Sequence, residues 1–122
     1  MSKNVLGTAL ISCCTSPLTG FYRDGFCRTD KYDQGRHVIC AVMTKEFLDY
    51  TKSRGNDLST PNFDFNFPGL QPGDKWCLCA NRWLEAYKNN LAPDVILEAT
   101  HEKALEVIDL ELLVECSLAE SS

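Results

Sequence analysis

The sequence has no run of basic residues and no long apolar run. Its 12 lysines and arginines are scattered along the chain, and the net charge is −5. Nucleic acids and anionic membranes bind clusters of Lys and Arg. No apolar stretch approaches the ~20 residues with which a helix crosses a bilayer. We therefore expect neither a nucleic acid nor a membrane as a partner.

Familiar cysteine patterns are also missing. The chain has seven cysteines, an odd number, and their spacings are not typical of a disulfide scaffold. The paired Cys-x₂₋₄-Cys modules of zinc ribbons are absent. No convincing export signal begins the chain, because the apolar run at 5–11 is short and Lys3 alone supplies positive charge. We expect a cytoplasmic protein with reduced thiols.

Length and composition fit one globular domain. The chain has 122 residues, of which 44% are hydrophobic and 24% are charged, as is ordinary for a soluble domain of this size. We expect a single domain over residues 1–122, with a frayed tail at about 117–122.

Residues 67–87 form the most informative stretch, and they read as turn, strand and helix. Trp76 to Ala80 is short and apolar, which predicts a buried strand. Cys77 and Cys79 lie two apart, so both sulfurs are expected on one face of that strand. Asn81 is expected to cap the following helix.

The remaining pattern predicts an α+β domain in two layers. Strands are expected at 37–43, 75–80 and 94–99, and helices at 44–54, 82–91 and 101–117, packed mainly on one face of the sheet. Thr44 and Thr100 are the expected helix caps, and Asp109 is expected to break the third helix. Two further short strands are predicted at 5–12 and around the alternating Phe63, Phe65 and Phe67. The long irregular segments argue against a regular doubly wound sheet.

The cysteines are the first candidates for chemistry. Cys77 and Cys79 can offer two thiolates to a soft metal such as Zn²⁺ or Cu(I). The further ligands available are Cys13, Cys14, Cys27, Cys40, His37 and His101. In a regular strand at 37–43, His37 and Cys40 face opposite ways and cannot share a site. Free cysteines also pack as small hydrophobes, so zinc is possible but is not favoured over no cofactor.

Reactive side chains are the second kind of candidate. Cys79 precedes the expected helix start and Arg82, which makes it the best placed thiol for stabilisation as a thiolate. Asp24, Asp57 and Asp74 lie in glycine turns, where a carboxylate can be catalytic or can bond its own backbone. His101 can act as a base, a metal ligand or a helix start.

Nearly the whole chain, from about Asn4 to Leu113, resembles a bacterial family known as domain of unknown function 2237. The resemblance rests on CCTSPLTGFYRDG (13–25), VICAVMTKEFLDY (38–50), SRGNDLSTP (53–61), FPGLQPGDKWCLCANRW (67–83) and ILEATH (96–101). It implies a small α+β domain with no assigned activity. The motif's cysteines fall on Cys13, Cys27, Cys40, Cys77 and Cys79, and its histidines fall on His37 and His101. Cys14 and Phe26 depart from the motif, which often has Ser and Cys there.

Three functions stay open at this point. The first is a small binding module with a cysteine-lined pocket for a metal or small ligand, in which Cys77 and Cys79 lie with Cys13 or Cys27 under the N-terminal loops. The second is a thiol- or carboxylate-dependent enzyme that uses Cys79 with Asp24, Asp57 or His101. The third is a structural or partner-binding domain whose thiols only pack.

Overall fold

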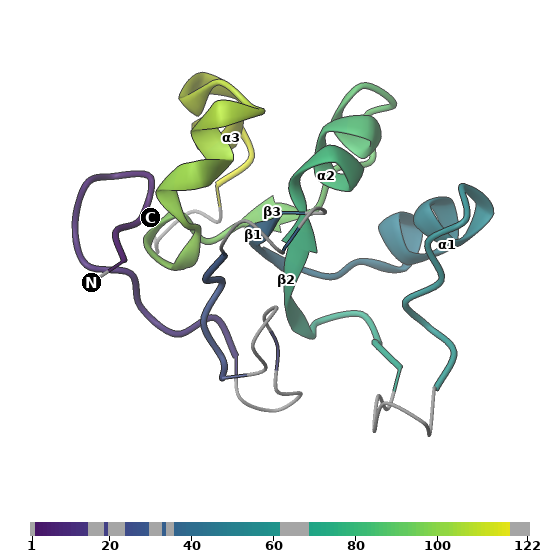
Figure 1. Cartoon of the computed structure of the whole chain (residues 1–122). Coiled ribbons are helices and arrows are strands. Elements are labelled where there is room, and N and C mark those ends of the chain that lie inside the picture. Colours follow the sequence, from purple (N-terminus) through teal and green to yellow (C-terminus); the bar gives the residue numbers. More distant parts are fainter. Residues whose placement is uncertain are drawn as a thin grey trace.

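The computed structural model describes residues 2–14, 19, 24–29, 33, 36–61 and 69–117. Its elements are the strands β1 (His37–Val42), β2 (Lys75–Cys79) and β3 (Asp94–Val95), the helices α1 (Lys45–Ser53), α2 (Ala80–Tyr87) and α3 (Leu110–Glu115), and the 3₁₀ turns η2 (Leu97–Ala99) and η3 (Glu102–Glu106). In Figure 1 the three α-helices lie above and to the right of the strands, and the N-terminal loops lie to the left of the strands and below them. The predicted α+β architecture is confirmed.

The sheet is antiparallel, in the order β2-β1-β3. The central strand β1 has no polar residue after His37 and is buried along its middle, as expected for a strand covered on both faces. Ile39 lies opposite Leu78, and Cys40 lies opposite Cys77. The register shifts between His37 and Ile39, so this end of β1 departs from a regular strand.

The two faces of the sheet carry different cores. On the helix side, Ile39 and Leu78 join the main hydrophobic core, in which Phe47 and Trp83 are both fully buried. Trp83 donates its indole N–H to the Pro93 carbonyl at 3.0 Å. On the loop side, Cys40 and Cys77 enter a second cluster made of cysteines, Ala99 and Ile96. The chain thus separates its aromatic and sulfur-bearing side chains by the alternation of the strands.

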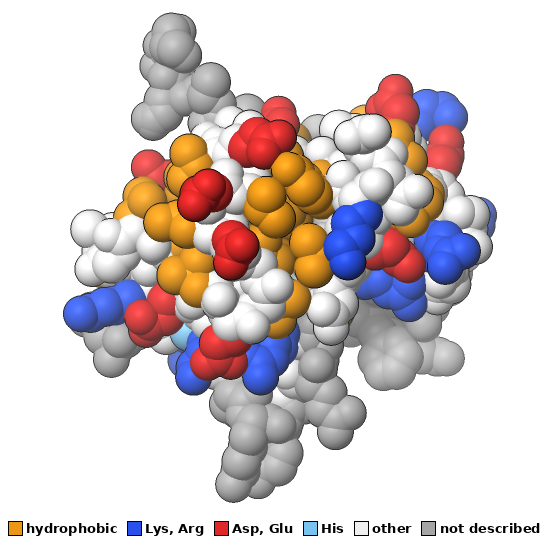
Figure 2. Space-filling view, turned by 90° about the horizontal axis from the view of Figure 1, so that it is seen from above, with side chains coloured by type: hydrophobic (Ala, Val, Ile, Leu, Met, Phe, Trp, Pro, Cys, Tyr) orange, Lys and Arg blue, Asp and Glu red, His pale blue; other side chains and the backbone are white. Residues whose placement is uncertain are grey.

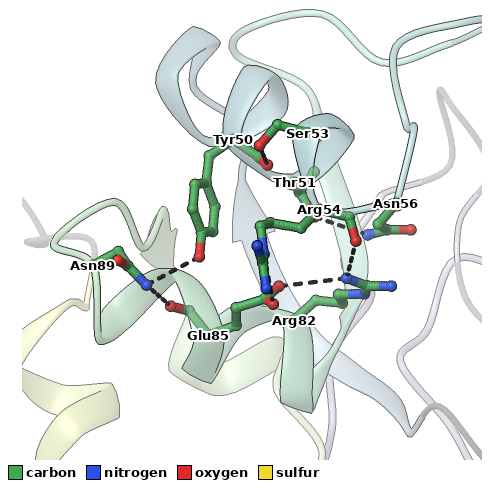
Figure 3. A network of polar contacts seen from close by, with 8 residues as sticks. All are labelled: Tyr50, Thr51, Ser53, Arg54, Asn56, Arg82, Glu85 and Asn89. Atoms are coloured by element: carbon green, nitrogen blue, oxygen red, sulfur yellow. Dashed lines mark hydrogen bonds and ion pairs between the residues drawn. The ribbon is translucent and has the colours of Figure 1, made fainter.

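A polar network joins α1 to α2 (Figure 3). Arg82 donates to the backbone carbonyl of Arg54 at 3.0 Å, at the C-terminal end of α1. The Glu85 carboxylate lies 3.4 Å from the guanidinium group of Arg54 and 3.4 Å from that of Arg82. Asn89 bridges the Tyr50 hydroxyl and the Glu85 carbonyl, each at 3.0 Å. The Arg82 cation is therefore bound at the end of α1.

Several predicted boundaries need correction. The cap of α2 is Cys79 and not Asn81, because Ala80 already lies in the helix. The segment at 94–99 is strand only for its first two residues and then becomes η2. The third helical segment has His101 and not Thr100 as its cap. Its division into η3 and α3 at Asp109 is as predicted. Thr44 caps α1 as predicted, since its side chain accepts from the Phe47 N–H.

The N-terminal segment is not the predicted strand. Between residues 5 and 12 the only ladder contact is an isolated bridge from Ala9 to Lys3. The buried Asn4 side chain supplies the missing partners: its amide donates to the Thr8 hydroxyl and to the carbonyls of Ala9 and Glu98. A local side-chain network thus replaces a β-ladder. The predicted strand at Phe63–Phe67 and the predicted frayed tail beyond Ser117 lie outside the described residues.

Candidate functional site

Two cysteines of the site come from the centre of the sheet. Cys40 on β1 and Cys77 on β2 are cross-strand partners, and both are almost fully buried. Partners of this kind place their side chains on the same face of the sheet, with Cβ atoms about 4.5–5.5 Å apart. The two sulfurs therefore start close together for reasons of backbone register alone.

The other two cysteines come from the N-terminal loops. Cys13 is 5% exposed and Cys27 is fully buried. The backbone N–H groups of Cys13 and Cys14 both donate to the Gly25 carbonyl, at 2.6 and 3.2 Å. Gly25 has φ +89°, a conformation that favours glycine. This turn lays the two loop segments beside each other under the sheet.

The four cysteines form two disulfides, Cys13–Cys40 and Cys27–Cys77. The sulfur atoms of Cys13, Cys27 and Cys77 all lie within 4.8 Å of one another. We call these four residues the cysteine cluster. The structure corrects the expectation of reduced thiols without a disulfide framework. The partners lie 27 and 50 residues apart, and cysteine spacing alone does not reveal a pairing that the tertiary fold creates.

Two buried threonines hold the backbone of the cluster. The Thr100 hydroxyl accepts from the Cys40 N–H at 3.1 Å and donates to the Ile96 carbonyl at 2.9 Å. The Thr19 hydroxyl accepts from the Cys77 N–H at 2.7 Å. Both threonines are fully buried. The sequence reasoning missed these two supports, because a hydroxyl that bonds a backbone group 58 or 60 residues away leaves no local pattern.

Cys79 lies apart from this group of sulfurs. It is a half-buried free cysteine at the N-cap of α2, and its cross-strand partner is His37. The three remaining free cysteines are thus distributed over different elements: Cys14 in the N-terminal loop, Cys79 before α2 and Cys116 after α3. The expected sulfur-rich group of Cys77 and Cys79 with Cys13 or Cys27 is thus corrected: the structure brings Cys77 together with Cys13 and Cys27, adds Cys40 and leaves Cys79 out.

The aspartates in the glycine turns bond their own turns. Asp24 accepts from the Phe26 N–H and pairs with Arg28. Asp57 accepts from the N–H groups of Ser59 and Thr60. Bonding to Thr60 holds the pKa of the Asp57 carboxyl below its usual value. Both carboxylates have the local structural role that such turns commonly give to aspartate.

His101 begins η3. Its Nδ1 accepts from the Lys103 N–H at 3.0 Å, so this nitrogen carries no proton. Burial lowers the pKa of the imidazole. The Val38 carbonyl receives the His101 N–H at 2.9 Å. The helix-start role that the sequence offered for His101 is the one the structure gives it.

An aspartate and a histidine that the enzyme hypothesis did not include form a close pair. His37 Nδ1 lies 2.6 Å from Asp33 Oδ1, and the Asp33 side chain is fully buried. The spacing of four residues was a possible signal, but the sequence at 27–35 predicts a polar surface loop. Because Asp33 is buried within that loop, its contact with His37 could not be read from polarity.

The surface offers a further apolar feature. Figure 2 shows hydrophobic side chains gathered on the face formed by α2 and α3, between acidic groups. Leu110 and Val114 on α3 are exposed, and a shallow hollow beside them is flanked by Asp109, Glu111 and Glu115.

In the part of the chain that the structure describes, no helix is long and apolar enough to cross a membrane.

Comparison with known proteins gives a family and no activity. The family model described as an uncharacterized protein conserved in bacteria, DUF2237, matches residues 3–117. No curated protein matches the chain. The match includes every cysteine of the cluster.

Proposed function

We propose that the chain, which belongs to the bacterial family DUF2237, is a thiol module whose cysteine cluster binds a soft divalent metal ion of the zinc type when reduced. When oxidised, the same four sulfurs form the two disulfides. The convergence of four cysteines from four separate segments carries this proposal. It refines the binding module with a cysteine-lined pocket that the sequence suggested.

The positions of the sulfurs support a common ligand. In a tetrahedral zinc site the Zn–S distance is ~2.3 Å, so the sulfurs lie about 3.8 Å apart. Cys13, Cys27 and Cys77 already have sulfurs within 4.8 Å of one another, and Cys40 is bonded to Cys13. Opening the two S–S bonds therefore leaves three sulfurs within 4.8 Å of one another, and the sulfur of Cys40, which lies outside that group, moves closer to complete a tetrahedral set.

The buried surroundings of the cysteine cluster also support a change between a metal-bound and an oxidised state. The cluster is buried against Ala99 and Ile96, and an apolar site disfavours uncompensated thiolates. A divalent cation offsets part of their charge. Disulfides remove the charge altogether. The fold thus suits either a metal-bound or an oxidised cluster better than four free thiolates.

The interconversion balances with a peroxide as oxidant. Two peroxide molecules each take two electrons from a pair of thiolates, so that two S–S bonds form. Both O–O bonds break, and four protons are consumed to make four water molecules. The metal leaves as a divalent cation. Two dithiol molecules, each giving two electrons and becoming a disulfide, supply the four electrons of the reverse step, and the cysteine thiols then lose their protons to the solvent as the metal binds.

The cellular compartment of the protein is part of this proposal. A cytoplasmic location, as predicted from the sequence, keeps thiols reduced, and there the metal-bound state is expected in the resting protein. In an oxidising compartment the two disulfides persist, and the chain is a stapled domain.

Metal content after anaerobic purification tests the proposal. The reduced protein is expected to hold about one zinc per chain, and Co²⁺ in its place is expected to give sulfur-to-metal charge-transfer bands. The Cys77→Ser variant should lose most of the metal. The matched control Cys116→Ser removes a cysteine outside the cluster and should keep it. Less than a tenth of an equivalent of metal in the reduced wild type, after incubation with zinc, would overturn the metal-binding function.

A further inference from the structure

Helix α3 presents an apolar row and an acidic row on its outward side. Leu110 and Val114 are four residues apart, so their side chains lie one above the other on the helix, and they are 37% and 48% exposed. Glu111 and Glu115 are also four residues apart and are exposed, which places them in a second row beside the first. We call these four residues the α3 face. Asp109 is exposed at the N-cap of the same helix.

The hollow on the α3 face is open rather than enclosed. The described residues that line it are the α3 face and Asp109, so all of them belong to α3 or to its cap. A pocket for a small molecule buries most of the ligand's surface between several walls. A surface lined by one helix does not enclose a small molecule in this way. It is suited to packing against another element of secondary structure.

Three contacts hold the α3 face in place. Leu113, on the inward side of the helix, is fully buried in the main hydrophobic core. The Tyr87 hydroxyl, at the end of α2, donates to the Glu115 carboxylate at 2.9 Å. The Val95 N–H of β3 donates to the Cys116 carbonyl at 2.8 Å. A partner therefore meets a preformed surface, which lowers the conformational entropy that binding has to overcome.

The charge around the α3 face is of one sign. Residues 107–117 contain three carboxylates, on Asp109, Glu111 and Glu115, and no lysine or arginine. Among the described residues, none of these three carboxylates forms an ion pair. Exposed apolar side chains that are rimmed by polar groups mark interaction surfaces. Because this rim is acidic, the complementary partner carries cations beside an apolar strip of its own.

Two occupants from the chain itself do not match this charge. A second copy of the protein brings the same carboxylates against those of the first, since a two-fold interface pairs identical surfaces, and facing like charges oppose association. The tail at 118–122 contains one glutamate and no basic residue, so it also lacks the cations that the acidic rim attracts. The charge of the α3 face therefore favours a different protein.

We propose that the α3 face is a docking surface for a basic amphipathic helix of a partner protein. Leu110 and Val114 contact the apolar side of that helix, whose anchors recur at helical spacing. Lysine or arginine side chains beside those anchors pair with Asp109 and Glu111. The resulting interface has an apolar core and a polar rim, as does the surface in Figure 2. It uses none of the clustered cysteines and is independent of metal binding.

A synthetic peptide of leucine and lysine tests the proposal. The probe has about 14 residues, or about four helical turns, with leucines along one side and lysines beside them. Fluorescence anisotropy of the labelled probe is expected to show saturable binding to the full chain. A probe with glutamate in place of lysine should bind about tenfold more weakly or less. Equal binding of the two probes, or no saturable binding of the lysine probe, would overturn the proposal.

Two variants with matched controls test whether the probe binds on α3. Val114→Ser removes an apolar contact and is expected to weaken binding at least about fivefold, whereas Ile11→Ser, at a residue that is 50% exposed in the N-terminal segment, should leave it unchanged. Glu111→Lys reverses one charge and should weaken binding about tenfold. Glu46→Lys makes the same change on α1, which lies beyond α2 in Figure 1, and should have less than about a twofold effect. Equal losses in the variants and their controls would contradict docking on α3.

The other occupants are tested with the full chain alone and with the probe. Val114→Ser is expected to leave the sedimentation of the chain unchanged, and dissociation of a dimer by this variant would replace the proposed partner with a second copy. Leu118→Ser is expected to leave the affinity for the probe unchanged. A gain of about tenfold in that variant would mean that the tail of the chain competes for the α3 face, and it would overturn the proposal.

Discussion

Cys40 and Cys77 face each other across β1 and β2, yet each is joined to a different loop cysteine and not to its neighbour. The sheet therefore presents a pair of sulfurs, and the N-terminal loops supply one partner for each. This arrangement fastens the loops to the sheet at two adjacent points. Because both points are buried, the redox state of four sulfurs controls how the N-terminal third of the chain is held.

Removing either disulfide from the oxidised protein is expected to be costly. The linked residues lie 27 and 50 positions apart, and the loss of these loop constraints corresponds to roughly 3.5 and 4 kcal/mol. We expect Cys13→Ser with Cys40→Ser, and Cys27→Ser with Cys77→Ser, to lower the free energy of unfolding by several kcal/mol each. Urea denaturation of the oxidised forms measures this. Cys14→Ser is the control, and a similar loss in that variant would contradict the loop explanation.

Thr100 is expected to support the cluster through one hydrogen bond. Thr100→Val keeps the shape of the side chain but leaves the buried Cys40 N–H without its partner, which costs about 1–3 kcal/mol. Thr100→Ser keeps the hydroxyl and should cost less. Thermal or urea unfolding of the two variants gives the comparison. Equal losses would mean that packing of the methyl group, and not the hydrogen bond, explains the position.

The sheet and its two helices could be predicted because their signals are local. Continuous apolar residues mark β1, and the Thr44 cap and the Gly55 turn mark the two ends of α1. The N-terminal segment could not be predicted in this way. Asn4 folds its side chain back on the backbone and contacts Glu98, 94 residues away. Such a contact has no local sequence pattern.

The site was predictable only in part for the same reason. Alternation on a strand places Cys77 away from Trp76 and Leu78, and that much is a local inference. The position of Cys79 depends on a helix that begins at Ala80, two residues earlier than the Asn81 cap would allow. The His37–Asp33 contact depends on a buried carboxylate within a polar loop. The position of Cys79 and the His37–Asp33 contact both depend on burial by residues far away in the sequence, which cannot be read from a single sequence.

Trp83 is expected to be the most sensitive position of the helix-side core. Its ring is fully buried, and its indole N–H bonds the Pro93 carbonyl. Trp83→Phe removes this bond and leaves a cavity, so we expect a loss of about 2–3 kcal/mol. Urea denaturation measures it. Tyr87→Phe is the matched control, because the Tyr87 ring stacks on Trp83 at 5.5 Å while its hydroxyl is exposed, and it should cost under about 1 kcal/mol.

Stability is expected to fall at mildly acidic pH because of His101. Burial lowers the pKa of this imidazole in the folded protein, whereas the unfolded chain has the ordinary value of about 6.5. Between the two values the unfolded state binds more protons, so the free energy of unfolding rises with pH in that range. The contribution is fully present above about pH 6.5 and is lost as the pH falls through the lower, folded value.

The His101→Asn variant separates this effect from other titrations. Asparagine can still accept from the Lys103 N–H, as Nδ1 of His101 does, but it has no proton to gain. We expect the variant to be somewhat less stable than wild type at pH 8 and to lose less stability between pH 7 and pH 5. Urea denaturation across this range gives both curves. Parallel curves would show that His101 does not carry the pH dependence.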